Sequence, residues 1–389
     1  AGLTALLSRF GPLRQSALQR AITLPLPFFA TMLYTRFRAP DAWLGLLLAL
    51  LAWACFLVGQ LRRLSSTSVV FRHWSFPWYV VGYGCSLAAP LLTLHYYHQP
   101  LLASTVLLTS MLYFASAWAF RVRWWLIPAG STLPLGLLIL LDFWAVPWPQ
   151  QSVALALVTT AYLLGGIGLE RQRGLARKFM APLYVVAHLV AALAVGWGLG
   201  PGVESLFGQA PWTDPARLWA AGGQLILGAS YGLFAWFQAR ERWAHVAAWL
   251  GVMAGGLIAS VFSRGHGSSA FKAALLAAVY VLAEQALASE TLRRRWPLAE
   301  RAWPLYRRAL LIAGWAVSAG AVTLALGRNL VLLGGGRSQA VWAIAGLLTV
   351  TALYALSAWL FRRRIFVWLA GALVIAPWTL LTVWGWFLW

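Results

Sequence analysis

LLASTVLLTSMLYFASAWAFRVR, residues 101–123, begins with 20 uncharged and mostly apolar residues and ends in Arg-Val-Arg. About 20 residues of α-helix cross a hydrocarbon layer about 30 Å thick, so this length suits one membrane-spanning helix. A transmembrane strand would need only about ten residues with alternating polarity, a pattern that this stretch lacks. The stretch therefore predicts a transmembrane α-helix that ends at a basic turn.

Similar apolar runs recur along the whole chain and predict an all-α, polytopic integral membrane protein. Of its 389 residues, 61% are hydrophobic and 10% are charged, against about 25% charged in a soluble domain. We expect a basic cytoplasmic segment at residues 1–19 and a single transmembrane domain at residues 20–389, with about 13 helices. The predicted spans are residues 20–36, 41–61, 76–96, 101–120, 124–142, 151–169, 180–200, 216–238, 243–263, 270–288, 308–327, 340–361 and 365–387.

The distribution of arginine and lysine predicts the orientation of these spans. Under the positive-inside rule, the loops that carry more of these residues face the cytoplasm. With the N-terminus in the cytoplasm, 23 of the 30 basic residues fall in cytoplasmic segments and 7 fall on the opposite side. We therefore expect a multi-pass protein of the cell membrane, with its last residue on the side opposite the cytoplasm.

The stretch that ends at the basic turn recurs later in the sequence. LYFASAWAFRVR (112–123) and LYALSAWLFRRR (353–364) are identical at eight of twelve positions, and SYGLFAWFQARER (230–242) fits with one inserted residue. We call each copy, together with the helix that returns from its turn, hairpin A. The tyrosines of the three copies, spaced by 118 and 123 residues, are Tyr113, Tyr231 and Tyr354.

A second hairpin type, hairpin B, is expected to alternate with hairpin A. The sequences Pro77-Trp-Tyr, Pro182-Leu-Tyr and Pro304-Leu-Tyr are expected to open its returning helix, because proline suits the first helical turn. One A and one B hairpin form a tandem four-helix unit, and an even number of helices makes the repeats parallel. The predicted hairpins are B at 41–96, A at 101–142, B at 151–200, A at 216–263, B at 270–327 and A at 340–387.

The first predicted helix, residues 20–36, resembles the returning half of a hairpin A. It carries Pro25 and Pro27, as the later returning helices also carry prolines, but its outgoing partner is missing. Two interpretations remain open. The sequence is a piece of a longer chain with more repeats, or its N-terminus has been processed and its C-terminus is natural.

Ionisable side chains inside the predicted spans are the first candidates for a functional site, because a charge in hydrocarbon is costly. Glu284 could hold a proton or a cation, or it could instead reach the surface or pair with an arginine. Asp142 lies at an outer helix end, where a carboxylate can reach water. His188 and His245 could each ligate a haem or chlorophyll-type metal, or pack as hydrogen-bonded core residues.

Three further candidates lie at the outer interface. His95 and His98 are expected on one helix face, as a metal or quinone site or as a polar cap. Asp41 lies in the first outer loop, where polytopic glycosyltransferases that use lipid-linked sugars place a catalytic carboxylate, but the sequence lacks their large outer domain. No zinc-ligand spacing, CxxCH or HExxH motif occurs in the sequence. We therefore assign no catalytic residue and no metal site, and the cofactor stays open.

RRRWPLAERAWPLYRR, residues 293–308, interleaves basic and aromatic side chains. This pattern suits contact with anionic lipid at the cytoplasmic face, docking of an acidic partner, or orientation by charge alone. The net charge of +21 would suggest nucleic acid in a soluble protein, but short arginine clusters between apolar runs favour lipid, so no nucleic-acid partner is expected. The arginines of this segment are Arg293, Arg294, Arg295, Arg301, Arg307 and Arg308.

Repetition with few buried polar groups favours a structural or scaffolding subunit of a larger membrane assembly, which contacts other membrane subunits. A transporter or flippase for a lipid-like substrate is the first alternative, and it requires a cavity lined by polar side chains. A pigment- or haem-binding subunit for electron or energy transfer is the second, since tryptophan-rich helices that contain histidine permit it. Whether the chain is an enzyme stays open, although the sequence does not favour it.

Overall fold

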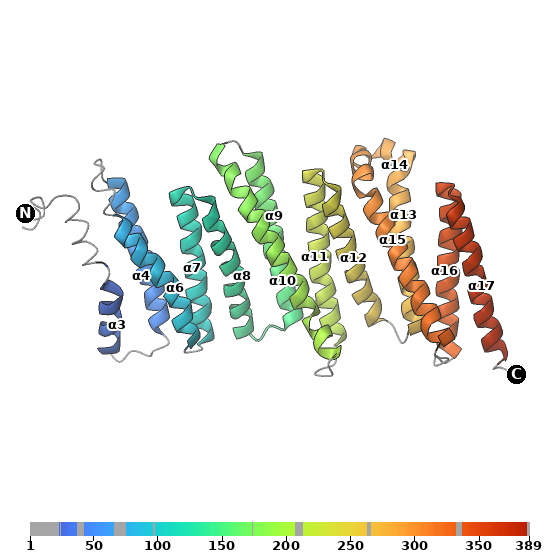
Figure 1. Cartoon of the computed structure of the whole chain (residues 1–389), viewed down its shortest axis with the longest axis horizontal. Coiled ribbons are helices and arrows are strands. Elements are labelled where there is room, and N and C mark those ends of the chain that lie inside the picture. Colours follow the sequence, from blue (N-terminus) through green and yellow to red (C-terminus); the bar gives the residue numbers. More distant parts are fainter. Residues whose placement is uncertain are drawn as a thin grey trace, which may run out of the picture. The chain divides into compact units, whose positions relative to one another are not determined.

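The computed structural model describes residues 23, 25–36, 43–65, 75–95, 98–172, 174–206, 213–262, 266–331 and 337–386. The ordered elements in this part of the chain are all helices, which are labelled in Figure 1. Eleven of them are long and apolar enough to cross a membrane. The prediction of a polytopic helical membrane protein is supported at this level.

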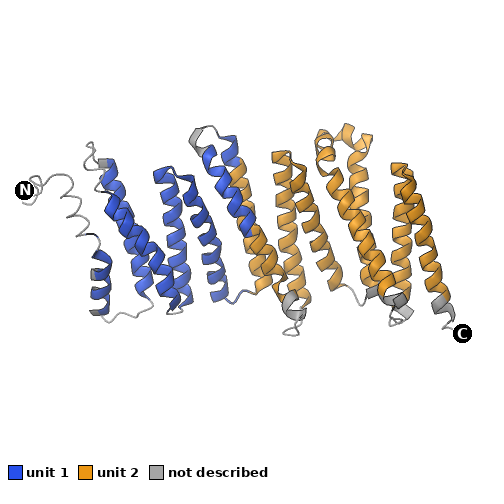
Figure 2. Ribbon diagram, in the orientation of Figure 1, with its two compact units in different colours: residues 1–146, 168–190 blue, residues 147–167, 191–389 orange. Residues whose placement is uncertain are grey.

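The chain divides into two compact units, residues 1–146 with 168–190 and residues 147–167 with 191–389 (Figure 2). Unit 1 contains α3 (Leu26–Arg36), α4 (Leu44–Ser65), α6 (Phe76–His95), α7 (Gln99–Phe120), the 3-10 helix η3 (Arg123–Trp125) and α8 (Leu126–Phe143). This unit contains two hairpins, because α4 packs along α6 and α7 packs along α8. Both helices of the first hairpin also contact α7.

Two helices belong partly to each unit. They are α9 (Trp148–Arg171) and α10 (Met180–Leu206), joined by the 3-10 helix η4 (Gly174–Phe179). Within unit 1, the Tyr184 hydroxyl donates a hydrogen bond of 3.0 Å to the Glu170 carboxylate. Within unit 2, the Trp197 indole donates one of 2.9 Å to the Gln151 side chain. Each unit therefore contains its own polar contact between these two helices.

Unit 2 also contains three helical hairpins in its described part. α11 packs along α12, α13 along α15, and α16 along α17, while α15 additionally contacts α12 and α16. The short α14 lies between α13 and α15 in the chain. The bounds are α11 (Asp214–Gln238), α12 (Glu241–Val261), α13 (His266–Ala288), α14 (Glu290–Arg295), α15 (Pro297–Val331), α16 (Arg337–Phe361) and α17 (Arg364–Trp386).

Small residues fill the helix contacts and large apolar residues face outward. Ala129 and Ala343 are fully buried, whereas Trp118, Trp359 and Trp368 are 81%, 75% and 78% exposed. Water would make such an outer surface costly, but hydrocarbon accommodates it, and small residues let helix backbones approach closely. The packing is therefore that of a protein whose solvent is lipid.

The three turns of the A type share one backbone feature. Arg121, Ala239 and Arg362 adopt positive φ angles of 57°, 49° and 50°. A left-handed residue at this position is a common way to end a helix, although glycine usually occupies it. Each of the three follows the tyrosine of its sequence copy by eight residues. The middle copy therefore reaches its turn without the inserted residue that the sequence alignment suggested.

Each predicted span overlaps a helix of the described chain, but the predicted start of one helix is wrong. α15 begins at Pro297, so Pro304 lies inside the helix and does not open it. Pro297 takes the first-turn position that suits proline. At about 1.5 Å per residue this helix is about 50 Å long, which exceeds a hydrocarbon layer of about 30 Å. The charged first turns of α15 can therefore project from the membrane.

Some predictions lie outside the reach of the structure. The basic segment at residues 1–19 and the candidate Asp41 fall outside the described residues. The described part of the first predicted span, α3, has 11 residues, and α6 is not among the eleven apolar helices. Membrane crossings at 20–36 and 76–96 therefore stay predictions.

Candidate functional site

The basic segment predicted from the sequence lies against two neighbouring helices of unit 2. Arg307 Nε lies 3.3 Å from Glu284 Oε1, near the end of α13. Arg308 Nη1 lies 3.6 Å from Glu241 Oε2, at the start of α12. The first turns of α15 therefore carry cations to both helices. We call the residues that meet here the charged cluster, and they are Glu241, His245, Glu284, Arg293, Arg301, Trp303, Arg307 and Arg308.

Glu284 is the most deeply buried charged group of the cluster. Its side chain is 1% exposed, whereas that of Arg307 is 43% exposed. The Gln285 amide donates a second contact of 2.7 Å to the Glu284 carboxylate. A buried carboxylate requires such partners, because an uncompensated charge in a low-dielectric interior is strongly unfavourable. Of the interpretations drawn from the sequence, pairing with an arginine is the one that this geometry supports.

Trp303 contacts two arginines of the basic segment through its ring. The guanidinium carbons of Arg307 and Arg293 lie 4.9 and 5.2 Å from the centroid of its ring. The indole N–H faces the Glu284 carboxylate, but within the described residues it reaches hydrogen-bond geometry with no acceptor. Cation–π attraction thus holds both arginines on the ring. The interleaved aromatic residue therefore helps to order the guanidinium groups beside it.

A second set of contacts joins α15 to the turn between α11 and α12. Arg301 Nη2 donates to the Trp236 backbone oxygen at 3.3 Å, and its guanidinium lies 4.9 Å from the Trp236 ring centroid. This carbonyl belongs to the last turn of α11, where helical carbonyls lack partners within the helix.

His245 Nε2 lies 3.6 Å from Glu241 Oε1, one turn away on α12.

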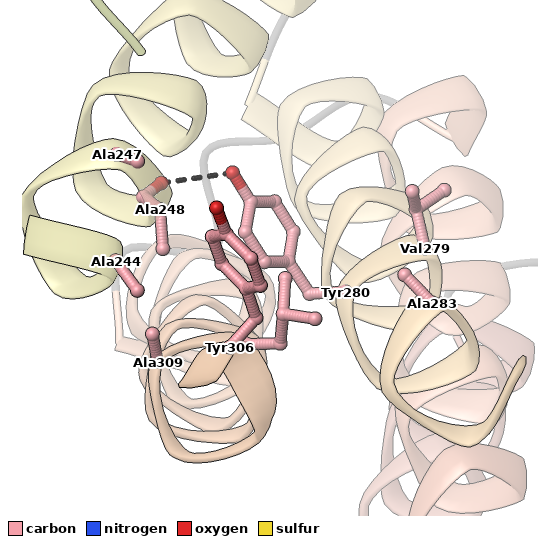
Figure 3. Close-up of a pocket in the computed structure, with 9 residues that line it drawn as sticks. Ala244, Ala247, Ala248, Val279, Tyr280, Ala283, Tyr306 and Ala309 are labelled. Atoms are coloured by element: carbon pink, nitrogen blue, oxygen red, sulfur yellow. Dashed lines mark hydrogen bonds between the residues drawn. The ribbon is translucent and has the colours of Figure 1, made fainter. Parts of the chain in front are cut away.

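An apolar pocket of about 250 Å³ lies beside the charged cluster, between α12, α13 and α15 (Figure 3). Two tyrosines line the pocket. The Tyr280 hydroxyl donates to the Ala248 backbone oxygen at 2.8 Å, and the Tyr306 hydroxyl donates to that of Gly232 at 2.5 Å. The lining residues are Ala244, Ala247, Ala248, Val279, Tyr280, Ala283, Tyr306, Ala309 and Leu310.

Three arginines of the basic segment lie in the short helix α14: Arg293, which contacts the Trp303 ring, and the exposed Arg294 and Arg295. Arg294 Nη2 lies 3.3 Å from Glu290 Oε2, with both side chains more than three quarters exposed. Arg295 ends the same helix and is also exposed. Exposed pairs of this kind contribute little free energy. These two arginines therefore face the surroundings of the protein and take no part in the contacts with α12 and α13 described above.

Asp142 lies at an exposed helix end, as the sequence suggested. Gln99 Nε2, in the first turn of α7, donates to Asp142 Oδ2 at 2.8 Å in the last turn of α8. The contact joins the open ends of one hairpin. It explains the carboxylate as a link between two helices whose polar atoms remain accessible.

The histidine candidates occupy separate places. His95 is the last residue of α6, and His98 precedes α7, so the expectation that they share a helix face is wrong. Pro100 in the first turn of α7 explains the new helix start, since proline is disfavoured in a helix interior. His188 lies half-buried in α10. Ligation of a haem or pigment by His188 or His245 stays a hypothesis.

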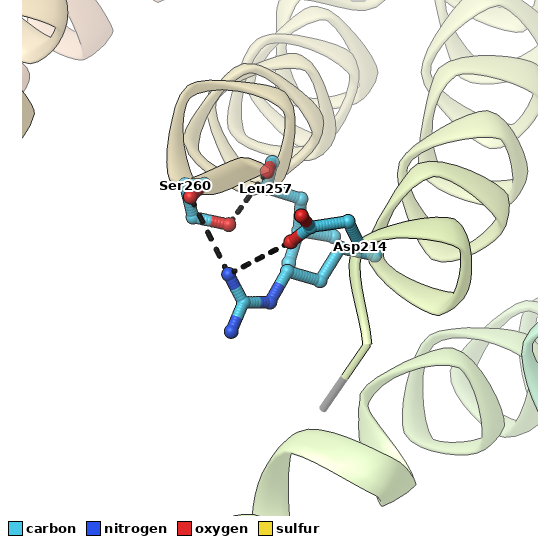
Figure 4. Close-up of polar contacts among 4 residues, drawn as sticks. Asp214, Leu257 and Ser260 are labelled. Atoms are coloured by element: carbon cyan, nitrogen blue, oxygen red, sulfur yellow. Dashed lines mark hydrogen bonds and ion pairs between the residues drawn. The ribbon is translucent and has the colours of Figure 1, made fainter. Parts of the chain in front are cut away.

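A polar contact that was not expected from the sequence joins the start of α11 to the end of α12, away from the turn between them (Figure 4). Arg217 Nη1 lies 3.6 Å from Asp214 Oδ1 and donates to the Ser260 backbone oxygen at 3.4 Å. Ser260 Oγ donates in turn to the Leu257 backbone oxygen at 2.7 Å. The guanidinium thus binds a carbonyl in the last turn of α12. We interpret this contact as a link between helix ends.

The charged cluster also contains residues that the sequence did not single out. Glu241 and Trp303 are its unpredicted members, and Tyr280 and Tyr306 complete the neighbouring pocket. Interleaved aromatic residues in the basic segment were a signal for Trp303 and Tyr306, but nothing in the sequence paired this segment with α12.

Chemically, the site combines guanidinium groups with an apolar pocket. Among the described residues, no group of three or more His, Cys, Asp and Glu side chains could hold a metal ion. Comparisons with models of protein families, with curated proteins and with solved structures found nothing that matches this chain.

Proposed function

We propose that the protein is a structural or scaffolding subunit of a larger membrane assembly, built from tandem helical hairpins. The observation that carries this proposal is the use of interior hydroxyl groups to join helices. Ser318 Oγ and the Tyr354 hydroxyl lie 2.9 Å apart between α15 and α16, and Thr160 Oγ1 lies 2.7 Å from Ser230 Oγ between α9 and α11. Side chains used in this way build a framework.

The tandem four-helix repeat is part of this proposal, and a recurring motif supports it. In unit 1, Ser86 donates to the Tyr83 backbone oxygen at 2.8 Å and lies 3.2 Å from the Tyr113 hydroxyl. In unit 2, Ser318 donates to the Trp315 backbone oxygen at 2.7 Å and contacts Tyr354. Since each serine uses its only proton on a carbonyl, each tyrosine is the donor to the serine.

Aromatic pairs extend this correspondence across all three A hairpins. Ring centroids lie 5.5 Å apart for Tyr113 and Trp125, 5.7 Å for Tyr231 and Trp243, and 6.1 Å for Tyr354 and Phe366. Each pair spans the turn with the same separation of twelve residues. The same contact in each hairpin is what a tandem repeat of one structural unit requires.

We further propose 13 membrane spans in the cell membrane, with the N-terminus and the basic turns in the cytoplasm. The bias of arginine towards alternate turns supports this orientation. Other membrane subunits are the proposed partners, and the large outward-facing apolar side chains, such as Trp359 and Trp368, are the surfaces that they would cover.

Extraction of the chain from its native membrane in polymer nanodiscs, followed by native mass spectrometry, tests the proposal. We expect a complex in which the chain has a fixed ratio to other membrane polypeptides. Cells that lack the chain should lose this complex while they still make the other subunits. A chain that is extracted alone, with every membrane complex intact in its absence, would contradict the scaffold.

Transport or flipping of a lipid-like substrate is a second candidate, because the buried Glu284 carboxylate lies close to an apolar pocket. Movement of a fluorescent phospholipid in proteoliposomes distinguishes the two functions. A scaffold should leave the rate at that of protein-free vesicles. A faster rate that Glu284→Gln abolishes, with folding intact, would favour the flippase instead.

A further inference from the structure

We propose that the pocket between α12, α13 and α15 binds one acyl chain of an anionic phospholipid, whose phosphate is bound by Arg308 at the pocket rim. The proposal goes beyond a scaffolding role, and it can be tested on the purified chain alone. It assigns a site for a single lipid molecule beside a basic segment for which the sequence suggested contact with anionic lipid, an acidic partner or orientation by charge, without a defined site.

The walls of the pocket select an apolar occupant. Alanine methyl groups from α12 and α15 form two sides, among them Ala244 and Ala309. Figure 3 shows the two tyrosine rings beside these alanines. Both tyrosine hydroxyl groups donate to backbone oxygens, those of Ala248 and Gly232, so their protons are already used. A hydrocarbon chain has no polar group that requires a hydrogen-bond partner, so it suits such a lining.

The size and opening of the pocket favour a chain segment. At about 250 Å³ it is slightly smaller than the roughly 300–1,000 Å³ of pockets that enclose whole drug-sized ligands. Val279, one of the lining residues on α13, is 60% exposed. The pocket therefore opens to the surroundings of α13, which in a bilayer consist of acyl chains.

Charge at the rim favours an anionic headgroup. Arg308 precedes the lining residue Ala309, and its side chain is 76% exposed. Its contact with Glu241 is long at 3.6 Å, and exposed Arg240 and Arg242 flank that glutamate in the chain. Guanidinium groups outnumber carboxylates at this end of α12. A phosphate oxygen is the acceptor that suits a guanidinium fork.

Native mass spectrometry of the purified chain in detergent, titrated with phosphatidylglycerol or phosphatidylcholine, tests both halves of the site. We expect one phosphatidylglycerol to bind about tenfold more tightly than phosphatidylcholine, a difference typical of one charge-assisted contact. Arg308→Ala should remove this preference. Arg294→Ala, in an exposed pair on α14, is the matched control and should preserve it.

Closing the pocket tests the acyl chain. Val279→Trp should lower the affinity for both lipids about tenfold, because its ring covers the opening. Leu275→Trp is the control on the same helix, at a residue 44% exposed and outside the pocket lining. If Val279→Trp does not fold, as judged by near-ultraviolet circular dichroism, the smaller Val279→Phe takes its place.

Three outcomes would overturn the proposal. The first is equal binding of both lipids to the wild-type chain, and the second is full affinity in the folded variant with the closed pocket. The third is complete displacement of phosphatidylglycerol by millimolar glycerol phosphate, which would show an anion site without an acyl chain. Because other subunits are absent from the assay, these results do not depend on the scaffold proposal.

Discussion

The α4–α6 and α7–α8 hairpins of unit 1 and the α13–α15 and α16–α17 hairpins of unit 2 are built alike. In each unit, both helices of the earlier hairpin contact the first helix of the later one. A serine and a tyrosine join them, Ser86 with Tyr113 and Ser318 with Tyr354. Uncharged groups therefore suffice for the contact between hairpins.

The two regions differ in their charged residues. Near its end, α13 carries the buried Glu284, which pairs with Arg307 of α15. In the corresponding last turns of α4, Gln60 places its Nε2 atom in a buried position without a hydrogen-bond partner among the described residues. Among the described residues of the α4–α6 hairpin there is no buried ion pair. The contact between helices in this type of hairpin therefore does not require the Glu284–Arg307 pair. This agrees with a function of the charged cluster other than helix packing.

Removal of Arg307 should have the largest effect. Arg307→Ala leaves the buried Glu284 carboxylate without its cation and should lower the free energy of unfolding by about 3 kcal/mol. Glu284→Gln should cost less, since Arg307 is 43% exposed and can turn outward. Unfolding with sodium dodecyl sulfate in mixed micelles measures both.

Arg63 of α4 provides the control in the other region. Its Nη1 atom donates to the Ala119 backbone oxygen at 3.3 Å, and no buried carboxylate depends on it in the described part of the chain. Arg63→Ala should therefore cost only about 1 kcal/mol. Equal losses for Arg63→Ala and Arg307→Ala would remove the distinction between the two regions.

Two glycines at helix contacts should respond differently to alanine. A Cβ atom at Gly45 would lie 2.6 Å from the Ala89 backbone oxygen, whereas at Gly314 the nearest atom, 2.9 Å away, is a Val281 methyl carbon. A backbone oxygen cannot move aside as a side chain can. We expect losses of about 2 kcal/mol for Gly45→Ala and about 1 kcal/mol for Gly314→Ala. The reverse order in the same unfolding assay would contradict this reasoning.

The serine contacts should behave alike in the two units. Ser86→Ala and Ser318→Ala each remove the acceptor of a buried tyrosine hydroxyl. We expect each to lower the free energy of unfolding by about 0.6 kcal/mol, an average value for hydrogen bonds between membrane helices. If one variant were neutral while the other lost several times this amount, the two motifs would not be equivalent. Fluorescence-monitored unfolding has the necessary resolution.

The smallest effect is expected at the exposed pair in α14. Glu290→Gln removes the partner of Arg294, but both side chains are largely exposed, and such pairs contribute little. The free energy of unfolding should change by less than about 0.3 kcal/mol. A larger loss would show that α14 depends on this pair, and the charge difference between the regions would then extend beyond Glu284.

Sequence reasoning located the helices and the turns of the A type. Apolar runs of sufficient length had to be helices, because in hydrocarbon every backbone polar group must find its partner within the segment. The arginines after Tyr113 and Tyr354 mark the ends of α7 and α16, because guanidinium groups stay out of hydrocarbon. The start of α15 cannot be located in this way, because the charged residues after Pro297 continue the helix beyond its apolar part.

By itself, the sequence determined that lipid surrounds this chain, where its helices lie and where its cations gather. Only the tertiary structure decided that Arg307 reaches Glu284, that Arg308 reaches Glu241, and that an apolar pocket lies beside them. The physical reason is the composition of the helices. Segments that are apolar on every side carry no periodicity to show which face is buried. Partners 23 residues apart, such as Glu284 and Arg307, could be paired only once the helices had packed.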